Sequence, residues 1–153
     1  MANTFSEHFE SSADQYFTKD APYKTRLDVN ITLEEPPRLG ASTSGIRDMA
    51  LDPARAFGQK EMVLGAGGRF KIEFGRTISD FQFNYYSWSD EGTAPFTVTF
   101  MHQKKYIAQL QIALSKKTVV FDNPSVKALS FDTLYITNSQ ESSLHFDSFR
   151  WKA

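Results

Sequence analysis

Polar and aromatic side chains alternate with large apolar ones near the middle of the chain, between residues 81 and 88. Successive side chains of an extended strand point to opposite faces, so the amide and aromatic residues share one face: Gln82, Asn84, Tyr86 and Trp88. An aromatic ring presents a large flat surface, and Tyr and Trp keep a polar group. The pattern therefore predicts recognition of a polar ligand that has a flat apolar side, such as a sugar ring.

Two further outward rows accompany this one. Thr97, Thr99 and Met101 alternate with large apolar residues, and Gln109 and Gln111 alternate with apolar residues in the next run. We expect the two glutamines to extend the same polar face and to contribute to ligand binding. A second interpretation stays open, in which the amides only solvate an outer sheet and Trp88 covers one end of the fold.

Catalytic signatures are absent from the sequence. No pair among the three His residues has zinc-ligand spacing, and neither H-E-x-x-H nor G-x-S-x-G occurs. The adjacent carboxylates Glu34-Glu35 and Asp90-Glu91 are typical of solvated turns. The sequence therefore predicts that the protein is not an enzyme and has no catalytic residues.

Composition narrows the function classes further. The 153 residues, 41% of them hydrophobic and 14 of them Phe, predict a single domain over residues 1–153 with a substantial core. A net charge of −1 argues against a nucleic-acid partner, and the absence of Cys excludes disulfides. The apolar runs fall far below the ~20 residues of a transmembrane segment, so we expect a soluble chain.

The N-terminus has neither a basic start nor an apolar run, so it is not expected to act as a signal peptide. Three localisations are compatible with it: the cytoplasm, export by a non-classical route, or a place within a larger secreted protein.

Short alternating runs separated by turn residues recur about every 8–12 residues, which indicates an antiparallel β-sandwich or barrel. Gly, Pro and Ser between residues 34 and 45 predict an exposed loop. A short helix or helical turn is expected only within residues 46–57, with Asp52 as N-cap and Pro53 at the first helical position.

Three stretches together resemble the jelly-roll β-sandwiches of the carbohydrate-binding-module and galactose-binding-like superfamily. They lie at the start, the middle and the end of the chain: His8-Phe9-Glu10-Ser11 followed by Tyr16-Phe17, residues 68–74 with 78–85, and residues 131–136 with 144–149. The resemblance implies an all-β fold, namely an antiparallel two-sheet jelly-roll β-sandwich of about 8–11 strands with little helix.

In many of these modules a structural calcium ion joins the first strand to the last. Carried over by position, the resemblance nominates Glu10 and Asp147 as ligands, with Asp28, Asp48 or Asp52 as further contributors. Carboxylate oxygens in flexible geometry suit Ca²⁺. Ser148 stands where the commoner motif has a second acidic residue, which lowers the charge of the implied site.

Two functions from different classes are compatible with these observations. The first is a non-catalytic, lectin-like carbohydrate-binding module whose partner is a glycan or polysaccharide and which holds a structural calcium. The alternative is a protein-interaction or assembly domain that uses the same sandwich without binding glycans.

Overall fold

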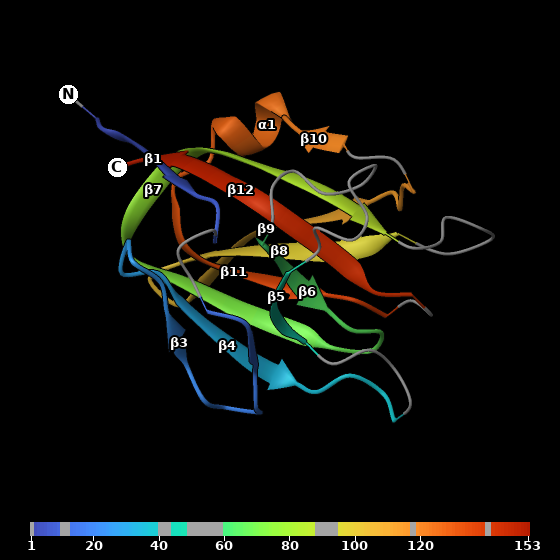
Figure 1. Cartoon of the computed structure of the whole chain (residues 1–153). Coiled ribbons are helices and arrows are strands. Elements are labelled where there is room, and N and C mark those ends of the chain that lie inside the picture. The colour runs from blue at the N-terminus through green and yellow to red at the C-terminus, as the bar shows by residue number, and fades with distance from the viewer. Residues whose placement is uncertain are drawn as a thin grey trace.

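The computed structural model of the chain describes residues 2–9, 13–39, 44–48, 60–87, 95–116, 119–139 and 142–153. These residues form twelve strands and one short helix, and the strands build two facing layers (Figure 1). Every strand pair is antiparallel. The expected antiparallel, nearly all-β sandwich is confirmed, and two strands of only two residues each bring the count above the expected 8–11.

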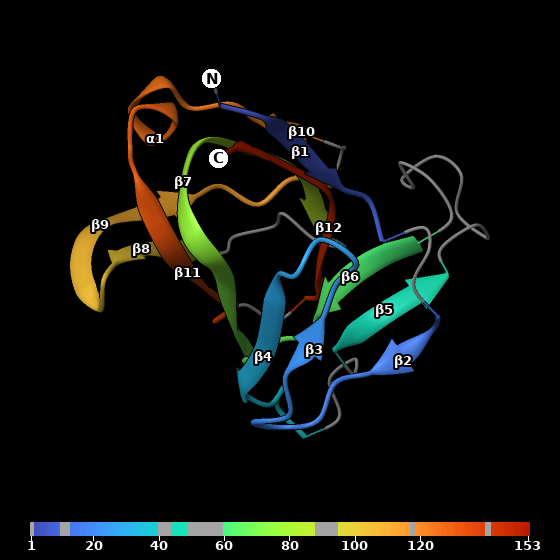
Figure 2. The ribbon, with the colours of Figure 1, turned by 90° about the vertical axis from the view of Figure 1, so that its left-hand side faces the viewer.

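The first sheet contains the order β3, β4, β7, β11, β8, β9, which can be followed across one layer in Figure 2. Its members are β3 (Tyr23–Lys24), β4 (Asn30–Glu35), the first part of β7 (Arg69–Ser87), β11 (Phe131–Thr137), β8 (Phe96–His102) and β9 (Lys105–Ile112). We call this layer the groove sheet, because a groove described below runs over its outer surface.

The second sheet contains the order β2, β5, β6, β12, β7, with β1 also paired to β12 and β10 to β7. Its members are β2 (Gln15–Tyr16), β5 (Gly45–Asp48), β6 (Lys60–Leu64), β12 (Leu144–Lys152), β1 (Thr4–Glu7), β10 (Val119–Phe121) and the last part of β7. We call this layer the terminal sheet, because it contains the first and the last strand.

β7 belongs to both sheets, because the strand bends in the middle. Its first part pairs with β4 and β11, and its last part pairs with β12 and β10. Gly75 lies at the bend with φ of 70°, a backbone conformation that glycine adopts without strain. The sequence pattern suggested two strands separated at Gly75; the structure instead joins them into one bent strand of 19 residues.

The core consists of the apolar residues that alternate along each strand. Phe131 packs edge-on against Phe100 at 4.9 Å between ring centroids, and Phe81 stacks on Phe149 at 5.7 Å. Fully burying a Phe side chain contributes about 1.5–3 kcal/mol, so these aromatic contacts account for much of the attraction between the sheets. Large apolar residues that stay exposed lie on separate elements: Tyr16, Leu39, Tyr106 and Val120.

The helix among the described residues is not the one that the sequence pattern suggested. Residues 46–48 of the expected 46–57 helix region lie in strand β5 (Gly45–Asp48), and the rest of that region, including Asp52 and Pro53, lies outside the described residues. The helix is α1 (Pro124–Lys127), in a segment that the sequence indicated as a turn. Oδ1 of Asn123 accepts hydrogen bonds from the backbone N–H groups of Ser125 and Val126, and Pro124 occupies the first turn.

The expected continuous strand over residues 23–33 is instead a hairpin. Thr25 turns the chain between β3 and β4: its Oγ1 accepts the backbone N–H of Leu27 at 3.2 Å and of Val29 at 3.3 Å. Asp28 adopts φ of 61° in this turn. Aspartate tolerates that left-handed conformation better than most residues do. The alternation of apolar and polar residues alone does not indicate a turn at this position.

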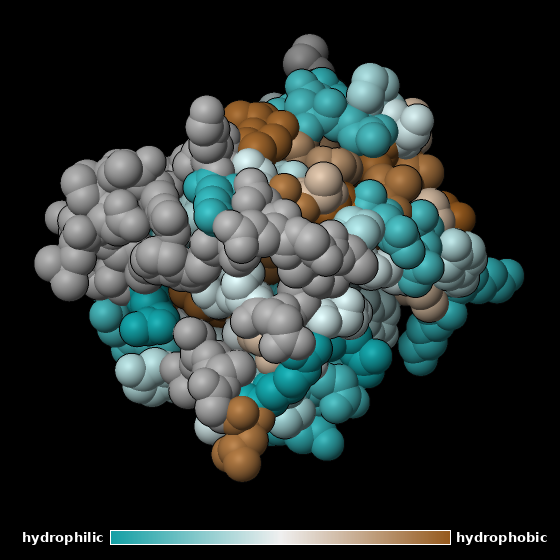
Figure 3. All heavy atoms as spheres, turned by 90° about the vertical axis from the view of Figure 1, so that its right-hand side faces the viewer, coloured by the Kyte–Doolittle hydropathy of each residue, from teal (hydrophilic) through white to brown (hydrophobic). Residues whose placement is uncertain are grey.

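No helix among the described residues is long and apolar enough to cross a membrane. Seen from the side opposite to Figure 2, the described surface is largely hydrophilic, and apolar side chains gather in separate places rather than over the whole face (Figure 3).

Candidate functional site

The outer face of the groove sheet carries aligned rows of side chains that run across its strands. Strand register places Asn30 opposite Glu73, Glu73 opposite Thr133, and Thr133 opposite Met101. A neighbouring row is formed by the residues two positions further along each strand: Thr32, Lys71, Tyr135, Thr99 and Gln109. The apolar residues of all these strands point inward, so their polar residues lie on the outer surface. The flat ring of Tyr135 and the flexible side chain of Met101 lie on the same outer surface.

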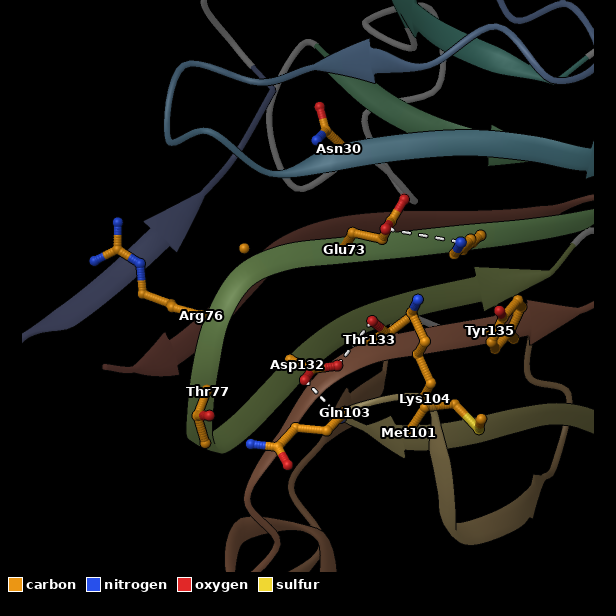
Figure 4. A pocket seen from close by; sticks show the side chains of 12 residues that line it. Asn30, Glu73, Arg76, Thr77, Met101, Gln103, Lys104, Asp132, Thr133 and Tyr135 are labelled. Carbon is orange, nitrogen blue, oxygen red and sulfur yellow. Dashed lines mark hydrogen bonds and ion pairs between the residues drawn. The ribbon is translucent and has the colours of Figure 1, made fainter.

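A groove of about 560 Å³ lies over these rows, of a size suited to a small ligand. Figure 4 shows the side chains that line it, which come from β4, β7, β8, β11 and the β8–β9 turn, with Arg76 pointing away from the others. Tyr135 and Met101 lie toward one end of the groove, Thr133 and Asp132 lie further along, and Arg76 lies at the other end.

The acidic groups of the groove already have partners. Glu73 forms an ion pair with Lys71 at 3.7 Å, and both side chains are partly exposed. Asp132 accepts the backbone N–H of Gln103 at 2.8 Å and the hydroxyl of Thr133 at 2.9 Å. The two hydrogen bonds position the carboxylate of Asp132, and the remaining lone pairs of both carboxylates can accept hydrogen bonds from a ligand.

The β8–β9 turn brings Lys104 to the groove. Gln103 and Lys104 have φ of 50° and 65°, the pair of left-handed conformations typical of a two-residue hairpin turn. The hydrogen bond from Gln103 to Asp132 ties this turn to β11. The turn is therefore held against the groove rather than extended into solvent.

Two of the sequence-predicted ligand residues lie on this face. Gln109 and Gln111 are exposed on β9, and Nε2 of Gln109 donates to Oγ1 of Thr99 at 3.0 Å. Both continue rows that cross the groove sheet, since Gln109 pairs with Thr99 and Gln111 with Thr97. Neither lines the groove itself.

The other predicted ligand residues belong to the terminal sheet. Gln82 and Asn84 are half-buried on the last part of β7, and Oδ1 of Asn84 accepts a hydrogen bond from Arg150 at 2.9 Å. Tyr86 is fully buried, and Trp88 lies outside the described residues. The expectation that the amides of residues 82–84 and 109–111 share one face is thus corrected, because the bend in β7 carries residues 82–86 into the other sheet.

Tyr86 belongs to a buried polar cluster that the sequence did not reveal. Its hydroxyl donates to Oε2 of Glu61 at 2.7 Å, and Nδ1 of His145 lies 3.1 Å from the same oxygen. Nε2 of His145 lies 2.9 Å from Oγ of Ser143, and the His145 and Tyr86 rings stack at 4.6 Å. Residues 61 and 145 are far apart in sequence, so only the pairing of β6, β12 and β7 brings them together.

The order Ser143–His145–Glu61 is that of a hydrolase triad, but its surroundings differ from those of an active site. All four residues of the cluster are more than nine-tenths buried, and neither of the two cavities described here is lined by any of them. A nucleophile needs space for the reacting carbonyl beside it. We therefore interpret the cluster as a structural one, in which Oε2 of Glu61 accepts hydrogen bonds while its Oε1 has no partner among the described residues.

A second cavity of about 210 Å³ lies at the edge where β2 pairs with β5. It is lined by Tyr16, Ile46 and Arg47 together with Asp14 and Gln15, and Asp14 is paired with Lys60. The cavity is less than half as large as the groove and includes one aromatic ring at its rim. The groove is therefore the better candidate for a binding site.

The three nominated calcium ligands are spread over the molecule. Asp147 is buried on β12, where its Oδ1 accepts the backbone N–H of Ser148 at 2.6 Å. Asp28 is exposed in the β3–β4 turn of the other sheet and pairs with Lys24 at 3.3 Å. Glu10 lies outside the described residues, and within the described ranges no three His, Asp or Glu side chains are grouped to hold a metal ion.

The chain next to Glu10 nevertheless lies close to Asp147. Nδ1 of His8 is 2.8 Å from Oγ of Ser148, and Glu7 pairs with Phe149 across the β1–β12 ladder. Glu7 is buried, its Oε1 accepts the backbone N–H of Phe9 at 2.9 Å, and its Oε2 has no partner among the described residues. A buried carboxylate oxygen without a partner is costly, and a cation would satisfy it.

The residues that line the groove were only partly visible in the sequence. The outward row containing Met101 was recognised, whereas Lys71, Glu73 and Tyr135 were seen as members of alternating strands without a role. The available signal was that these residues alternate with buried apolar ones. It was not sufficient because alternation does not identify which strands are neighbours.

Searches of the sequence against family models and against curated proteins find no match. Solved structures do match. A mutant of the carbohydrate-binding module CBM29-2 in complex with mannohexaose superposes with a TM-score of 0.51 and 10% identity, over 99% of this chain and 92% of that chain. A second mutant of the same module gives a TM-score of 0.51 at 8% identity, over 99% and 93% of the two chains.

A rhamnosidase from Klebsiella oxytoca with rhamnose bound matches with a TM-score of 0.50 and 15% identity, over 92% of this chain but only 29% of the rhamnosidase chain. At such low identities these likenesses concern the fold. The chain has the jelly-roll β-sandwich fold found in carbohydrate-binding modules and other β-sandwich domains of carbohydrate-active proteins.

Proposed function

We propose that the chain is a non-catalytic carbohydrate-binding module, and that it binds a glycan in the groove on the outer face of the groove sheet. The observation that supports this most strongly is the lining of that groove: the Tyr135 ring and the Met101 side chain lie beside fixed carboxylates, a lysine and an amide. The fold agrees with this proposal, since matching structures include a module bound to mannohexaose.

The chemistry of the groove suits a sugar. A pyranose ring has an apolar face of C–H groups that packs on an aromatic ring, and hydroxyls around its edge that need donors and acceptors. Tyr135 offers the ring. Asp132 and Glu73 offer acceptors, and Lys71 and Asn30 offer donors, all from neighbouring strands of one rigid sheet. Polar groups that are already positioned lose little entropy when they bind a ligand.

The proposal is tested by titrating a glycan panel calorimetrically against the wild type and Tyr135→Ala. We expect the substitution to weaken binding about tenfold or more, because it removes the stacking surface, at little change in melting temperature. Tyr16→Ala is the matched control: Tyr16 is an exposed tyrosine on β2 of the terminal sheet. We expect this control to bind like the wild type.

Two results would contradict the proposal. Absence of binding to every glycan, together with a stoichiometric protein partner, would favour a protein-interaction or assembly domain. Glycan binding that survives Tyr135→Ala would place the site elsewhere, for example near Gln82 and Asn84, whose role in binding remains a prediction.

We further propose that a structural calcium ion binds where the ends of the chain meet, held by Asp147 and Glu10. Its support is the buried carboxylate of Asp147, the contact between His8 and Ser148, and Oε2 of Glu7 on the adjoining strand, which has no hydrogen-bond partner among the described residues. Carboxylate oxygens are the ligands that Ca²⁺ prefers. Asp28, paired with Lys24 in the turn of the other sheet, is not part of this proposal.

A further inference from the structure

We propose that the binding surface continues beyond Met101 onto β9, where Tyr106 forms a second aromatic platform, and that the ligand is a linear oligosaccharide lying across β11, β8 and β9. This inference rests on the proposed function, and it names a further binding residue and the class of glycan. It follows from the register of the β8–β9 hairpin.

A β-bulge in this hairpin turns Tyr106 to the outer face of the groove sheet. Phe100 pairs with Ala108, whereas Met101, the next residue of β8, pairs with Tyr106, so Ile107 is the extra residue of the bulge. Residues directly opposite each other on antiparallel strands share a face of the sheet. Tyr106 therefore lies on the same outer face as Met101, which lines the groove.

Without the bulge, the alternation of β9 would point Tyr106 inward. Ala108, Leu110 and Ile112 pair with buried residues of β8 and pack against the core, and Tyr106 precedes Ala108 by two positions. The Tyr106 residue is instead 64% exposed, and its side chain forms no hydrogen bond or ring contact with any described residue. Bulges re-aim side chains in this way beside functional sites. The ring is thus available for a ligand to stack on.

Tyr106 ends a row of side chains that begins in the groove. The register runs from Glu73 through Thr133 and Met101 to Tyr106. The strands that carry this row, β7, β11, β8 and β9, lie side by side in Figure 2. The outer surface is therefore continuous from the groove to the edge strand.

The spacing of the two tyrosines suits a chain of sugars rather than one sugar. Tyr135 on β11 is opposite Thr99, and Tyr106 on β9 is opposite Met101, so two strand spacings and a step of two residues separate them. With strands about 4.8 Å apart and residues about 3.3 Å apart along a strand, their Cα atoms lie about 12 Å from each other. One pyranose ring cannot stack on both tyrosines. A sugar on Tyr135 reaches Tyr106 only through further linked units that pass over Met101.

The path between the tyrosines also offers polar groups. Thr99 is opposite Tyr135 on one side and Gln109 on the other, and Nε2 of Gln109 donates to Oγ1 of Thr99 at 3.0 Å. This hydrogen bond positions the exposed amide of Gln109, whose Oε1 can accept a hydrogen bond from a sugar hydroxyl. Apolar platforms with polar atoms beside them match a sugar ring, which has an apolar face and hydroxyls at its edge.

The test compares affinities across oligosaccharide length. Linear manno-, gluco- and xylo-oligosaccharides, from the disaccharide to the hexasaccharide, are titrated calorimetrically against the wild type, Tyr106→Ala and Tyr106→Phe. We expect the wild type to bind the hexasaccharide of at least one series more tightly than its disaccharide, because only the longer ligand reaches Tyr106. Tyr106→Ala should bind that hexasaccharide about 3- to 10-fold more weakly, as expected for the loss of one stacked ring.

Tyr106→Ala should bind the disaccharide like the wild type, and Tyr106→Phe, which keeps the ring, should bind both ligands like the wild type. Lys105→Ala is the matched control, because Lys105 is exposed in the same hairpin and pairs with His102. Its side chain leaves the strand on the side opposite to Tyr106. An unchanged melting temperature shows that each variant is folded.

Other results would overturn the inference. A hexasaccharide that binds no better than the disaccharide, or a gain with length that survives Tyr106→Ala, removes the second platform. The proposed function stays intact in that case if Tyr135→Ala still weakens binding. Equal weakening of both ligands by Tyr106→Ala contradicts the linear path, since it shows that the disaccharide already contacts Tyr106. No binding of any oligosaccharide overturns the proposed function and this inference together.

Discussion

The hydroxyl of Tyr86 is a donor that the buried cluster of the terminal sheet needs. It lies 2.7 Å from Oε2 of Glu61, and the residue has no exposed surface. Hydrogen bonds to charged groups contribute about 1.5–3 kcal/mol when buried, and the stacked ring of His145 keeps the phenol in place. A residue that looked like a surface ligand by its alternation is therefore a stability determinant.

We accordingly expect Tyr86→Phe to lower the free energy of unfolding by about 1–3 kcal/mol. Glycan affinity should stay unchanged, because Tyr86 lies in the terminal sheet and the groove lies on the groove sheet. Urea denaturation and calorimetric titration measure the two quantities. Tyr16→Phe, which removes an exposed hydroxyl, should change stability by no more than about 0.5 kcal/mol. Loss of glycan binding by Tyr86→Phe at wild-type stability would contradict our placement of the site.

At the scale of elements, a network of ion pairs attaches α1 to the end of the sandwich. Lys127 of α1 lies 3.5 Å from Asp80 of β7 and 3.4 Å from Asp122, and Lys152 of β12 lies 2.8 Å from Asp80. The hydrogen bond from Lys152 lowers the pKa of Asp80, and the charges of Lys152 and Lys127 lower it further. The hydrogen bond and charge of Asp122, together with Asp80, raise the pKa of Lys127.

These shifts predict how stability changes with pH. Because the pKa of Asp80 is lower in the folded than in the unfolded protein, its contribution is complete above the ordinary aspartate value of about 3.9 and is lost as the pH falls through the folded-state pKa. The stability difference between wild type and Asp80→Asn should therefore shrink in acid, as measured by urea denaturation at a series of pH values. A difference that stays constant down to pH 2 would refute the assignment.

At the scale of the whole molecule, β1 and β12 close the sandwich by joining the two ends of the chain. Register pairs Phe5 with Trp151 and Glu7 with Phe149, and the Phe5 and Trp151 rings stack at 6.0 Å. No turn links the two terminal strands, so the backbone ladder between them and side-chain contacts such as this stacking set their alignment. A cation held by carboxylates from both ends of the chain would add a further link between these two ends.

The proposed calcium ion should therefore stabilise the fold, because a ligand bound only by the folded state favours it by mass action. At about 100 times its Kd, calcium should raise the melting temperature by about 5–10 °C over the value in excess chelator. Asp147→Asn should abolish this rise, and Asp28→Asn, the matched control in the other sheet, should retain it. Identical melting curves in chelator and in calcium would refute the proposal.

Much of the fold was predictable from the alternation of side chains. Phe96, Val98 and Phe100 are buried and Thr97 and Thr99 are not, as the pattern indicated. The two-sheet sandwich followed from many such runs. The helix at Pro124 was missed because it is only four residues long, too short for a helical period to show.

Alternation is a local property: it determines which side chains leave a strand on the same side, because the backbone imposes a period of two. It determined the buried and exposed faces of β7, β8 and β11 for this protein. Which strands are neighbours depends on pairings between distant segments, and one bend at Gly75 assigns Lys71 and Asn84 of a single strand to opposite sheets. Only the tertiary structure could therefore bring Tyr135, Glu73 and Lys104 to one groove and bury Tyr86 beside Glu61.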